Sequence, residues 1–138
     1  MSTNLTSLHV DIVTPDGTAY SADNVDMVVA RALDGEFGIM KNHTPLVAAL
    51  QVWPVRIKQG NKETSIAVFG GLLEVQNNVV TITTRNAEPA DYIDVERAIR
   101  ARDRALSRLE NPAPDIDRER AELALKRAIA RLHATGKE

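Results

Sequence analysis

The chain has 138 residues and no cysteine, and its 17 Lys and Arg against 19 Asp and Glu give a formal net charge of -2 at pH 7. This length suffices for one compact domain of about 100 residues with a smaller appendage. The lack of cysteine excludes a disulfide framework and a thiolate metal site. The first residues do not resemble a secretory leader, and no segment has the roughly 20 apolar residues that cross a bilayer, so we expect a soluble intracellular protein that a membrane complex could still hold.

The charge is divided unevenly along the chain. Residues 1–90 hold 6 Lys and Arg against 9 Asp and Glu, whereas residues 91–138 hold 11 against 10, and nine of these 11 are arginines. The composition changes near Glu88 and Pro89. We therefore expect two parts, residues 1–88 and residues 89–138.

Alternating apolar residues predict short strands in the first part. Leu8, Val10 and Ile12 alternate with polar residues, which places their side chains on one face of a sheet. The same alternation occurs at Val25, Met27 and Val29, at Val55 and Ile57, at Ile66 and Val68, at Leu73 and Val75, and at Val80 and Ile82. Turns are predicted at residues 15–17, 60–61 and 77–78. This pattern favours a sandwich or flattened barrel of two antiparallel sheets over an α/β sheet.

The second part shows helical spacing twice. In the first predicted helix Asp91 is the expected N-cap, Asp94 lies in the first turn, and the prolines after Asn111 end the helix. In the second, Asp115 or Asp117 is the expected cap and Gly136 the stop. The two apolar stripes are Ala98, Ala101, Ala105 and Leu109, and Ala121, Leu125, Ala128 and Leu132.

These features predict an α+β fold, with an N-terminal antiparallel β-sandwich followed by a C-terminal two-helix antiparallel hairpin. Alanine seams bury little area, and burial contributes only about 25 cal/mol per Å². We therefore expect the hairpin to need another surface.

Arginines form a stripe along the predicted hairpin. Arg97, Arg100, Arg104 and Arg108 follow one face of the first helix, and Arg127 and Arg131 lie four residues apart on the second. Phosphate groups or an acidic protein surface would neutralise such a cluster. The alternative is a solvated face with intrahelical ion pairs, such as Asp94 with Arg97 or Glu122 with Lys126.

Catalytic signatures are missing from the sequence. There is no paired acid and base with a nucleophile, no metal-ligand cluster and no phosphate-binding glycine loop, so we expect a non-catalytic protein without a catalytic cofactor. Trp53 beside Pro54 and the pair Gly70-Gly71 are most simply packing and turn features, although they would also suit a subunit interface.

Four segments carry a resemblance to a known family. "VTPDG" at residues 13–17, "GEFGIMKNHTPLVAAL" at 35–50, "IAVFGGLLEVQNNVVTI" at 66–82 and "DIDRERAELALKRAIARL" at 115–132 stand in an order and spacing that resemble the epsilon subunits of bacterial F-type proton-translocating ATP synthases. The resemblance covers nearly all of the chain. It implies a β-sandwich and a helical hairpin, in agreement with the periodicities.

The resemblance also implies a place in a rotor. The sandwich would sit at the foot of the central stalk, bound to the gamma subunit and to the membrane ring of c subunits, on the cytoplasmic face of the bacterial cell membrane. The loop from Glu36 to His43 would touch the ring, with these two residues as polar contacts. Lys41-Asn42 replaces the commoner Pro-Gly here, and asparagine tolerates the left-handed conformation that glycine would adopt.

The hairpin would be the regulatory part. In the family it extends toward the alpha and beta subunits and hinders ATP hydrolysis, or it folds against the sandwich. Two helices of about 18 residues span roughly 54 Å end to end and half of that when folded.

Some bacterial members bind ATP in the folded form, through an Ile/Leu-Asp-x-x-Arg-Ala motif that "IDVERA" at residues 93–98 matches. Asp94 and the backbone near Glu88 and Ile93 would contact the adenine. Ala98 would leave room for the base, and Arg97, Arg127 and Arg131 would face the phosphates. Whether magnesium accompanies this regulatory ATP is left open. The implied ATP-binding residues are Glu88, Ile93, Asp94, Arg97, Ala98, Arg104, Arg127 and Arg131.

Two other functions compete with this interpretation. A nucleic-acid-binding domain would need a continuous basic face, yet residues 91–138 sum only to +1. A generic helical-hairpin adaptor would show no nucleotide response, and periodicity alone does not exclude it.

Overall fold

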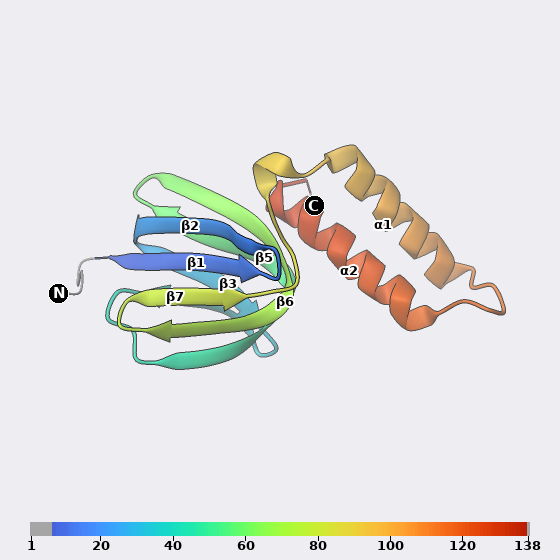
Figure 1. Cartoon of the computed structure of the whole chain (residues 1–138). Helices are drawn as coiled ribbons and strands as arrows, with labels where there is room; N and C mark the ends of the chain where they lie inside the picture. The colour runs from blue at the N-terminus through green and yellow to red at the C-terminus, as the bar shows by residue number, and fades with distance from the viewer. Residues whose placement is uncertain (1–6, 138) are drawn as a thin grey trace.

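The computed structural model describes residues 7–137, so the expectation about the chain's first residues lies outside the described part. Figure 1 shows a β-sandwich with a helical hairpin at one end. The strands are β1 (Leu8–Thr14), β2 (Gly17–Val25), β3 (Met27–Ala32), β4 (Gly35–Met40), β5 (Leu46–Gln59), β6 (Lys62–Gln76), β7 (Val79–Thr83) and β8 (Ala87–Pro89). A short 3-10 helix, η1 (Ala90–Tyr92), leads into α1 (Val95–Glu110) and α2 (Arg118–Ala134).

The strands form one hydrogen-bonded sheet, in the order β2-β1-β7-β6-β5-β3-β4 with β8 beside β6, that folds over on itself. Its inner faces meet in an aliphatic core that includes Val10, Ile57 and Ile82. The predicted sandwich is confirmed. One pairing departs from the predicted antiparallel pattern, because β1 runs parallel to β7, with Val10 opposite Val80. The tight turn after β6 makes β7 antiparallel to β6, and β1 occupies the free edge of β7 in the same direction as β7.

The predicted turns set the hairpins of the sandwich. Asn77 and Asn78 both have positive φ, at 53° and 64°, as a two-residue turn between β6 and β7 requires. The predicted strand through Val25, Met27 and Val29 is wrong. Asn24, at φ 57°, and the break at Asp26 separate β2 from β3. Val25, at the end of β2, enters the core as expected, but in β3 the phase is shifted, so that Val28 and Ala30 join the core cluster in place of Met27 and Val29.

The pair Gly70-Gly71 lies inside β6, at the point where its neighbour changes. Residues before it pair with β8 and residues after it pair with β7. Both glycines have positive φ, at 80° and 120°. A Cβ atom on Gly71 would collide with the Thr83 carbonyl oxygen. The two glycines therefore let one long strand bend past two different partners.

Both helices begin at an aspartate. Asp94, not the expected Asp91, is the N-cap of α1, because Asp91 lies in η1. Asp117 caps α2 in the same way, its side chain accepting from the Arg120 amide. At the other end the Gly136 amide donates to the His133 carbonyl and the Lys137 amide to the Leu132 carbonyl, a glycine stop at φ 75° as predicted.

Helix α2 lies between α1 and the sandwich (Figure 1), and it contacts α1, β5 and β6. Its alanine stripe packs on that of α1, with Ala98, Ala105, Ala121 and Ala128 buried. A second buried cluster joins the hairpin to the sandwich through Ala67, Ile93 and Ala134. The sheet thus supplies the further surface that the alanine seam was expected to need.

Among residues 7–137, no helix combines the length and apolar character needed to cross a membrane.

Candidate functional site

A cavity of about 420 Å³ opens where the two helices meet the end of the sandwich, and we call it the hairpin cavity. Its walls come from β8, η1, α1 and α2 together. A volume of this size falls within the range of small-molecule sites. The lining residues are Glu88, Tyr92, Asp94, Arg97, Ala98, Ala101, Arg104 and Arg131.

The first turn of α1 positions the acidic side of the cavity. The Asp94 side chain accepts a hydrogen bond from the Arg97 amide at 3.1 Å, which fixes the carboxylate at the helix start. Ala98 lies one turn later and is buried, and its small side chain leaves space in the cavity for a flat group. Arg97 and Arg104 are exposed on the same face, and neither forms an ion pair within residues 7–137. The cavity therefore offers two free guanidinium groups.

Arg131 closes the cavity from α2. Its Nε and one terminal nitrogen donate to Glu88 Oε2 at 2.9 and 2.8 Å. Its guanidinium also lies over the Phe69 ring, 4.8 Å from the centroid. Both side chains of the ion pair are mostly shielded from solvent. Arg131 is thus held in place before any ligand arrives, with donors left over.

Six of the eight residues implied for ATP line this cavity, and two do not. Ile93 is only 9% exposed and packs with Ala67 and Ala134, so its side chain belongs to the joint between sandwich and hairpin. Arg127 lines a separate cavity beside Phe69 and Arg85. Binding of a nucleotide by these residues remains a prediction.

Two lining residues were not among the residues that the resemblance implied for ATP binding. Tyr92 immediately precedes "IDVERA" and is 83% exposed, so an aromatic face stands at the cavity wall. Ala101 lies one turn after Ala98 on the stripe that was assigned to helix packing. A large exposed aromatic next to a ligand motif was the available signal for Tyr92.

Neither of the two intrahelical pairs named for the alternative interpretation is formed, although another intrahelical pair is. Asp94 caps the backbone amide of Arg97 instead of its side chain. Glu122 pairs with Arg118 at 3.2 Å, not with Lys126. Arg100 and Arg108 are exposed, so of the stripe on α1 only Arg97 and Arg104 face the hairpin cavity.

The two residues predicted to touch a membrane ring lie outside the hairpin cavity, on β4 and in the segment that follows it. Glu36 is in β4 and not in a loop, since strand pairing with β3 extends to Gly35, and Arg56 lies 3.8 Å from its carboxylate. His43 follows the turn in which Asn42 adopts the predicted left-handed conformation, at φ 63°. Both residues line a further cavity with Leu33 and Val47, which are 80% and 64% exposed. This surface of the sandwich therefore presents apolar side chains to the surroundings.

Trp53 belongs to the joint and not to the core. The centroids of the Trp53 and His133 rings are 4.3 Å apart. The Arg31 guanidinium lies over the Trp53 ring, 4.1 Å from the centroid of that ring. Trp53 is therefore a packing residue, as the simplest prediction holds, but it packs between sandwich and hairpin and is not part of the aliphatic core. Trp53 links β5 to the last turn of α2.

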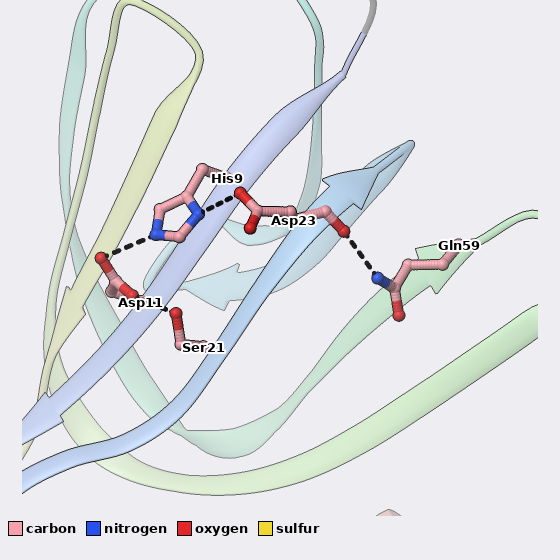
Figure 2. A network of polar contacts seen from close by, with 5 residues as sticks. All are labelled: His9, Asp11, Ser21, Asp23 and Gln59. Atoms are coloured by element: carbon pink, nitrogen blue, oxygen red, sulfur yellow. Dashed lines mark hydrogen bonds and ion pairs between the residues drawn. The ribbon is translucent and has the colours of Figure 1, made fainter. Parts of the chain in front are cut away.

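A polar network joins β1 to β2 on the outer face of the sandwich (Figure 2). The two ring nitrogens of His9 lie 2.7 Å from Asp23 and 3.0 Å from Asp11, so only the imidazolium can donate to both. The hydrogen bond with Asp23 is the main cause that raises the pKa of His9, against partial burial. The Ser21 hydroxyl, which donates to Asp11 at 2.6 Å, lowers the pKa of that carboxyl.

Two family models match the chain. The model described as "ATP synthase, Delta/Epsilon chain, beta-sandwich domain" covers residues 7–90, and "ATP synthase, Delta/Epsilon chain, long alpha-helix domain" covers residues 91–136. Over 107 residues the chain is 52% identical to the ATP synthase epsilon chain of Alkalihalophilus pseudofirmus, covering 78% of this chain and 80% of that protein. It is 50% identical to that of Brevibacillus brevis over 106 residues, 76% of this chain and 80% of the relative.

Among solved structures, the fold is similar to a chain in the cryo-EM structure of the Euglena gracilis mitochondrial ATP synthase, OSCP/F1/c-ring. The TM-score is 0.80 at 24% identity, over 94% of this chain and 81% of that one. This likeness concerns the fold, including the association of a sandwich with helices.

Proposed function

The chain belongs to the delta/epsilon chain family of ATP synthases, and from that premise we propose that it is a non-catalytic central-stalk subunit whose helical hairpin responds to ATP. The hairpin cavity is the observation that carries the nucleotide part of this proposal. It brings an acidic cap, an exposed aromatic ring and three arginines together from both helices and from the sandwich.

The chemistry of the cavity suits an adenine nucleotide. Tyr92 offers a face for stacking, Ala98 leaves space beside it, and Asp94 provides an acceptor for an amino group. Arg97, Arg104 and Arg131 provide forked donors for phosphate oxygens. Nothing in this proposal requires hydrolysis, because these residues bind and neutralise the ligand.

Binding would favour the folded hairpin by mass action. Arg131 comes from α2 and Arg97 and Arg104 from α1, so the cavity exists only while the helices lie side by side. A ligand that binds one conformation alone shifts the population toward it. In the extended hairpin the same arginines would be free to contact acidic surfaces of the beta subunit. ATP would thereby relieve inhibition of hydrolysis.

The sandwich would carry the rotor contacts. The exposed Leu33 and Val47 line one cavity with Glu36 and His43, and so form an apolar surface with polar groups. We assign this surface to the ring of c subunits and another face of the sandwich to the gamma subunit, at the cytoplasmic face of the bacterial membrane. Co-purification of the chain with a bacterial gamma subunit tests the stalk assignment.

Calorimetric titration of ATP into the full chain tests the nucleotide site. We expect saturable binding, and Arg104→Ala should weaken it at least about tenfold, because a charge-assisted contact contributes on the order of 1.5 to 3 kcal/mol. Arg104 is the cleaner choice because Arg131 also holds Glu88. Tyr92→Ala should weaken ATP but leave tripolyphosphate unaffected, since it removes the stacking face alone.

Arg100→Ala is the matched control, since Arg100 is an exposed arginine of the same helix outside the cavity. It should bind ATP like the unmodified protein. No binding at millimolar ATP, or equal losses in Arg100→Ala and Arg104→Ala, would contradict the site.

A further inference from the structure

A single buried side chain connects two turns of the sandwich. Asn78 is 6% exposed and lies in the turn between β6 and β7, at φ 64°. Its Oδ1 accepts a hydrogen bond from the Asn42 backbone amide at 2.6 Å, and its side-chain amide donates to Asn42 Oδ1 at 3.3 Å. The two residues stand 36 positions apart in the chain. These bonds, which we call the Asn42–Asn78 pair, therefore tie the turn after β4 to the turn after β6.

The orientation of the Asn78 side chain follows from the chemistry of its partner. A backbone amide can only donate, so the atom that faces the Asn42 nitrogen is the Asn78 side-chain oxygen, and the NH2 group is left to donate to Asn42 Oδ1. Asn78 is also fixed through its backbone, because its carbonyl accepts from the His9 amide of β1 at 2.9 Å. A buried side-chain amide with these bonds does not carry the cost of an unsatisfied polar group. Asn78 can therefore hold the Asn42 amide in one place.

The turn that Asn78 holds carries His43. Residues 41–45 join β4 to β5 and lie in no strand, so the sheet ladders do not fix their backbone. Asn42 has the left-handed conformation, and the half-buried His43 follows it directly. The hydrogen bond to the Asn42 amide thus fixes the backbone one residue before His43. Loss of that bond would leave the middle of the turn less restrained than its two ends.

His43 belongs to the surface that the proposed function assigns to the ring of c subunits. This surface consists of Leu33, Glu36, His43 and Val47, and we call it the ring-contact surface. Two of these side chains are apolar and largely exposed, and the other two are polar. An interface gains affinity when its groups already have the bound arrangement before the partner arrives, because ordering them then costs less free energy. A fixed turn at His43 would supply this arrangement for one of the polar groups.

We propose that Asn78 is a positioning residue for the ring-contact surface. Asn78 is not one of the residues that form this surface, and it acts through Asn42 on the turn that carries His43. The inference rests on the proposed assignment of the surface to the ring of c subunits, and it adds a residue that the assignment does not include. Removal of the Asn78 side chain should lower the population of the turn that is competent to bind. The apparent affinity for the ring falls by the same factor.

Binding of the full chain, in complex with its gamma subunit, to immobilised rings of c subunits in detergent tests the inference. We expect Asn78→Gly to weaken binding about three- to tenfold, since one hydrogen bond shifts an equilibrium by about that factor. Glycine keeps the left-handed conformation at position 78, so the substitution removes the side chain without straining the turn. Asn77→Gly is the matched control, because Asn77 is exposed and has φ 53° in the same turn. It should bind the ring like the unmodified protein.

Asn78→Asp separates positioning from a general effect on folding. Aspartate keeps an acceptor for the Asn42 amide and tolerates the left-handed conformation, and the Asn42 side chain can turn its own NH2 group toward the carboxylate. We expect Asn78→Asp to bind the ring within about twofold of the unmodified protein. Hydrogen exchange at residues 41–45 should be faster in Asn78→Gly than in Asn78→Asp or Asn77→Gly. Circular dichroism and binding to the gamma subunit verify that each variant is folded.

Val47→Asp distinguishes this inference from the proposed function, because it places a carboxylate directly in the ring-contact surface at an exposed position. Weaker ring binding by Val47→Asp, with no change in Asn78→Gly, would overturn the inference and leave the ring assignment standing. Equal weakening by Asn78→Gly and Asn78→Asp, or by Asn78→Gly and Asn77→Gly, would also overturn it, since the bond to the Asn42 amide would then not matter. Unchanged ring binding by Val47→Asp, or no ring binding by the unmodified protein, would overturn both.

Discussion

Some charged side chains of this protein are paired with opposite charges, and others face a cavity. In the sheet, His9 meets Asp11 and Asp23, so its positive charge is matched where it stands. Along the hairpin, Arg97 and Arg104 face a cavity without an acidic partner among residues 7–137. The first arrangement stabilises a strand pair, whereas the second leaves binding capacity for a ligand.

The His9 network predicts a pH-dependent contribution to stability. Its pKa is raised in the folded state, so the contribution is complete below the ordinary value of about 6.5 and is lost as the pH rises through the folded value. The pKa of Asp11 is lowered, so its contribution is present above about pH 4 and is lost as the pH falls through its folded value. Both contributions are complete near pH 5.5.

Thermal unfolding of His9→Gln beside the unmodified protein tests this prediction. Because the network is partly exposed, we expect Tm to fall by only about 1 to 3 °C at pH 5.5 and by less at pH 8.5. A difference that is equal at both pH values, or larger at pH 8.5, would contradict the imidazolium assignment.

The packing of strand β6 against the end of β7 requires a glycine at position 71. Gly71→Ala introduces a side chain at φ 120° and brings its Cβ against the Thr83 carbonyl oxygen. Gly17→Ala is a matched control, since Gly17 has φ 118° but open space around its Cβ position. The pair separates backbone strain from the collision.

We expect Gly71→Ala to lower the free energy of unfolding by about 2 to 4 kcal/mol, and Gly17→Ala by about 1 kcal/mol. Urea unfolding followed by circular dichroism measures both. Equal losses would show that φ alone matters and that the β6–β7 contact relaxes around the new methyl group.

The helices obey local rules at their ends but not along their charged faces. Asp117, one of the two caps that the sequence offered, caps α2, and Gly136 stops it as predicted. The arginine stripe on α1 does not act as one unit, because only Arg97 and Arg104 reach the hairpin cavity. Periodicity places residues on one side of a helix, but the neighbouring element decides which of them find a partner.

The two parts of the molecule meet through small apolar contacts and a few polar ones. Ala134 packs with Ala67 and Ile93, His133 stacks on Trp53, and Arg131 binds Glu88. Such a joint buries little area, so it can separate without unfolding the aliphatic core of the sandwich.

Ala134→Asp tests whether the hairpin can detach from an intact sandwich. A carboxylate at this buried position is costly without a partner, so the hairpin should leave the sheet. We expect a larger radius of gyration in small-angle X-ray scattering and a shifted emission of Trp53, the single tryptophan, while the sandwich keeps its strand signal in circular dichroism. Ser107→Asp, at an exposed position of α1, should change neither quantity. An unchanged radius in Ala134→Asp would mean that the joint is rigid.

Local patterns in the sequence determined the two-part fold, the asparagine turn at residues 77–78 and the C-terminal ends of both helices, because each depends on the backbone preferences of a few neighbouring residues. The resemblance implied eight residues for ATP binding, and six of them line the hairpin cavity. Only the tertiary structure decided the parallel pairing of β1 with β7, the strand position of Glu36 and the burial of Ile93. It also placed Arg127 and Arg85, 42 positions earlier in the chain, around one cavity, and Tyr92 and Arg104 around another. These outcomes depend on which distant segments meet across the sheet and the hairpin, and no local periodicity encodes that choice.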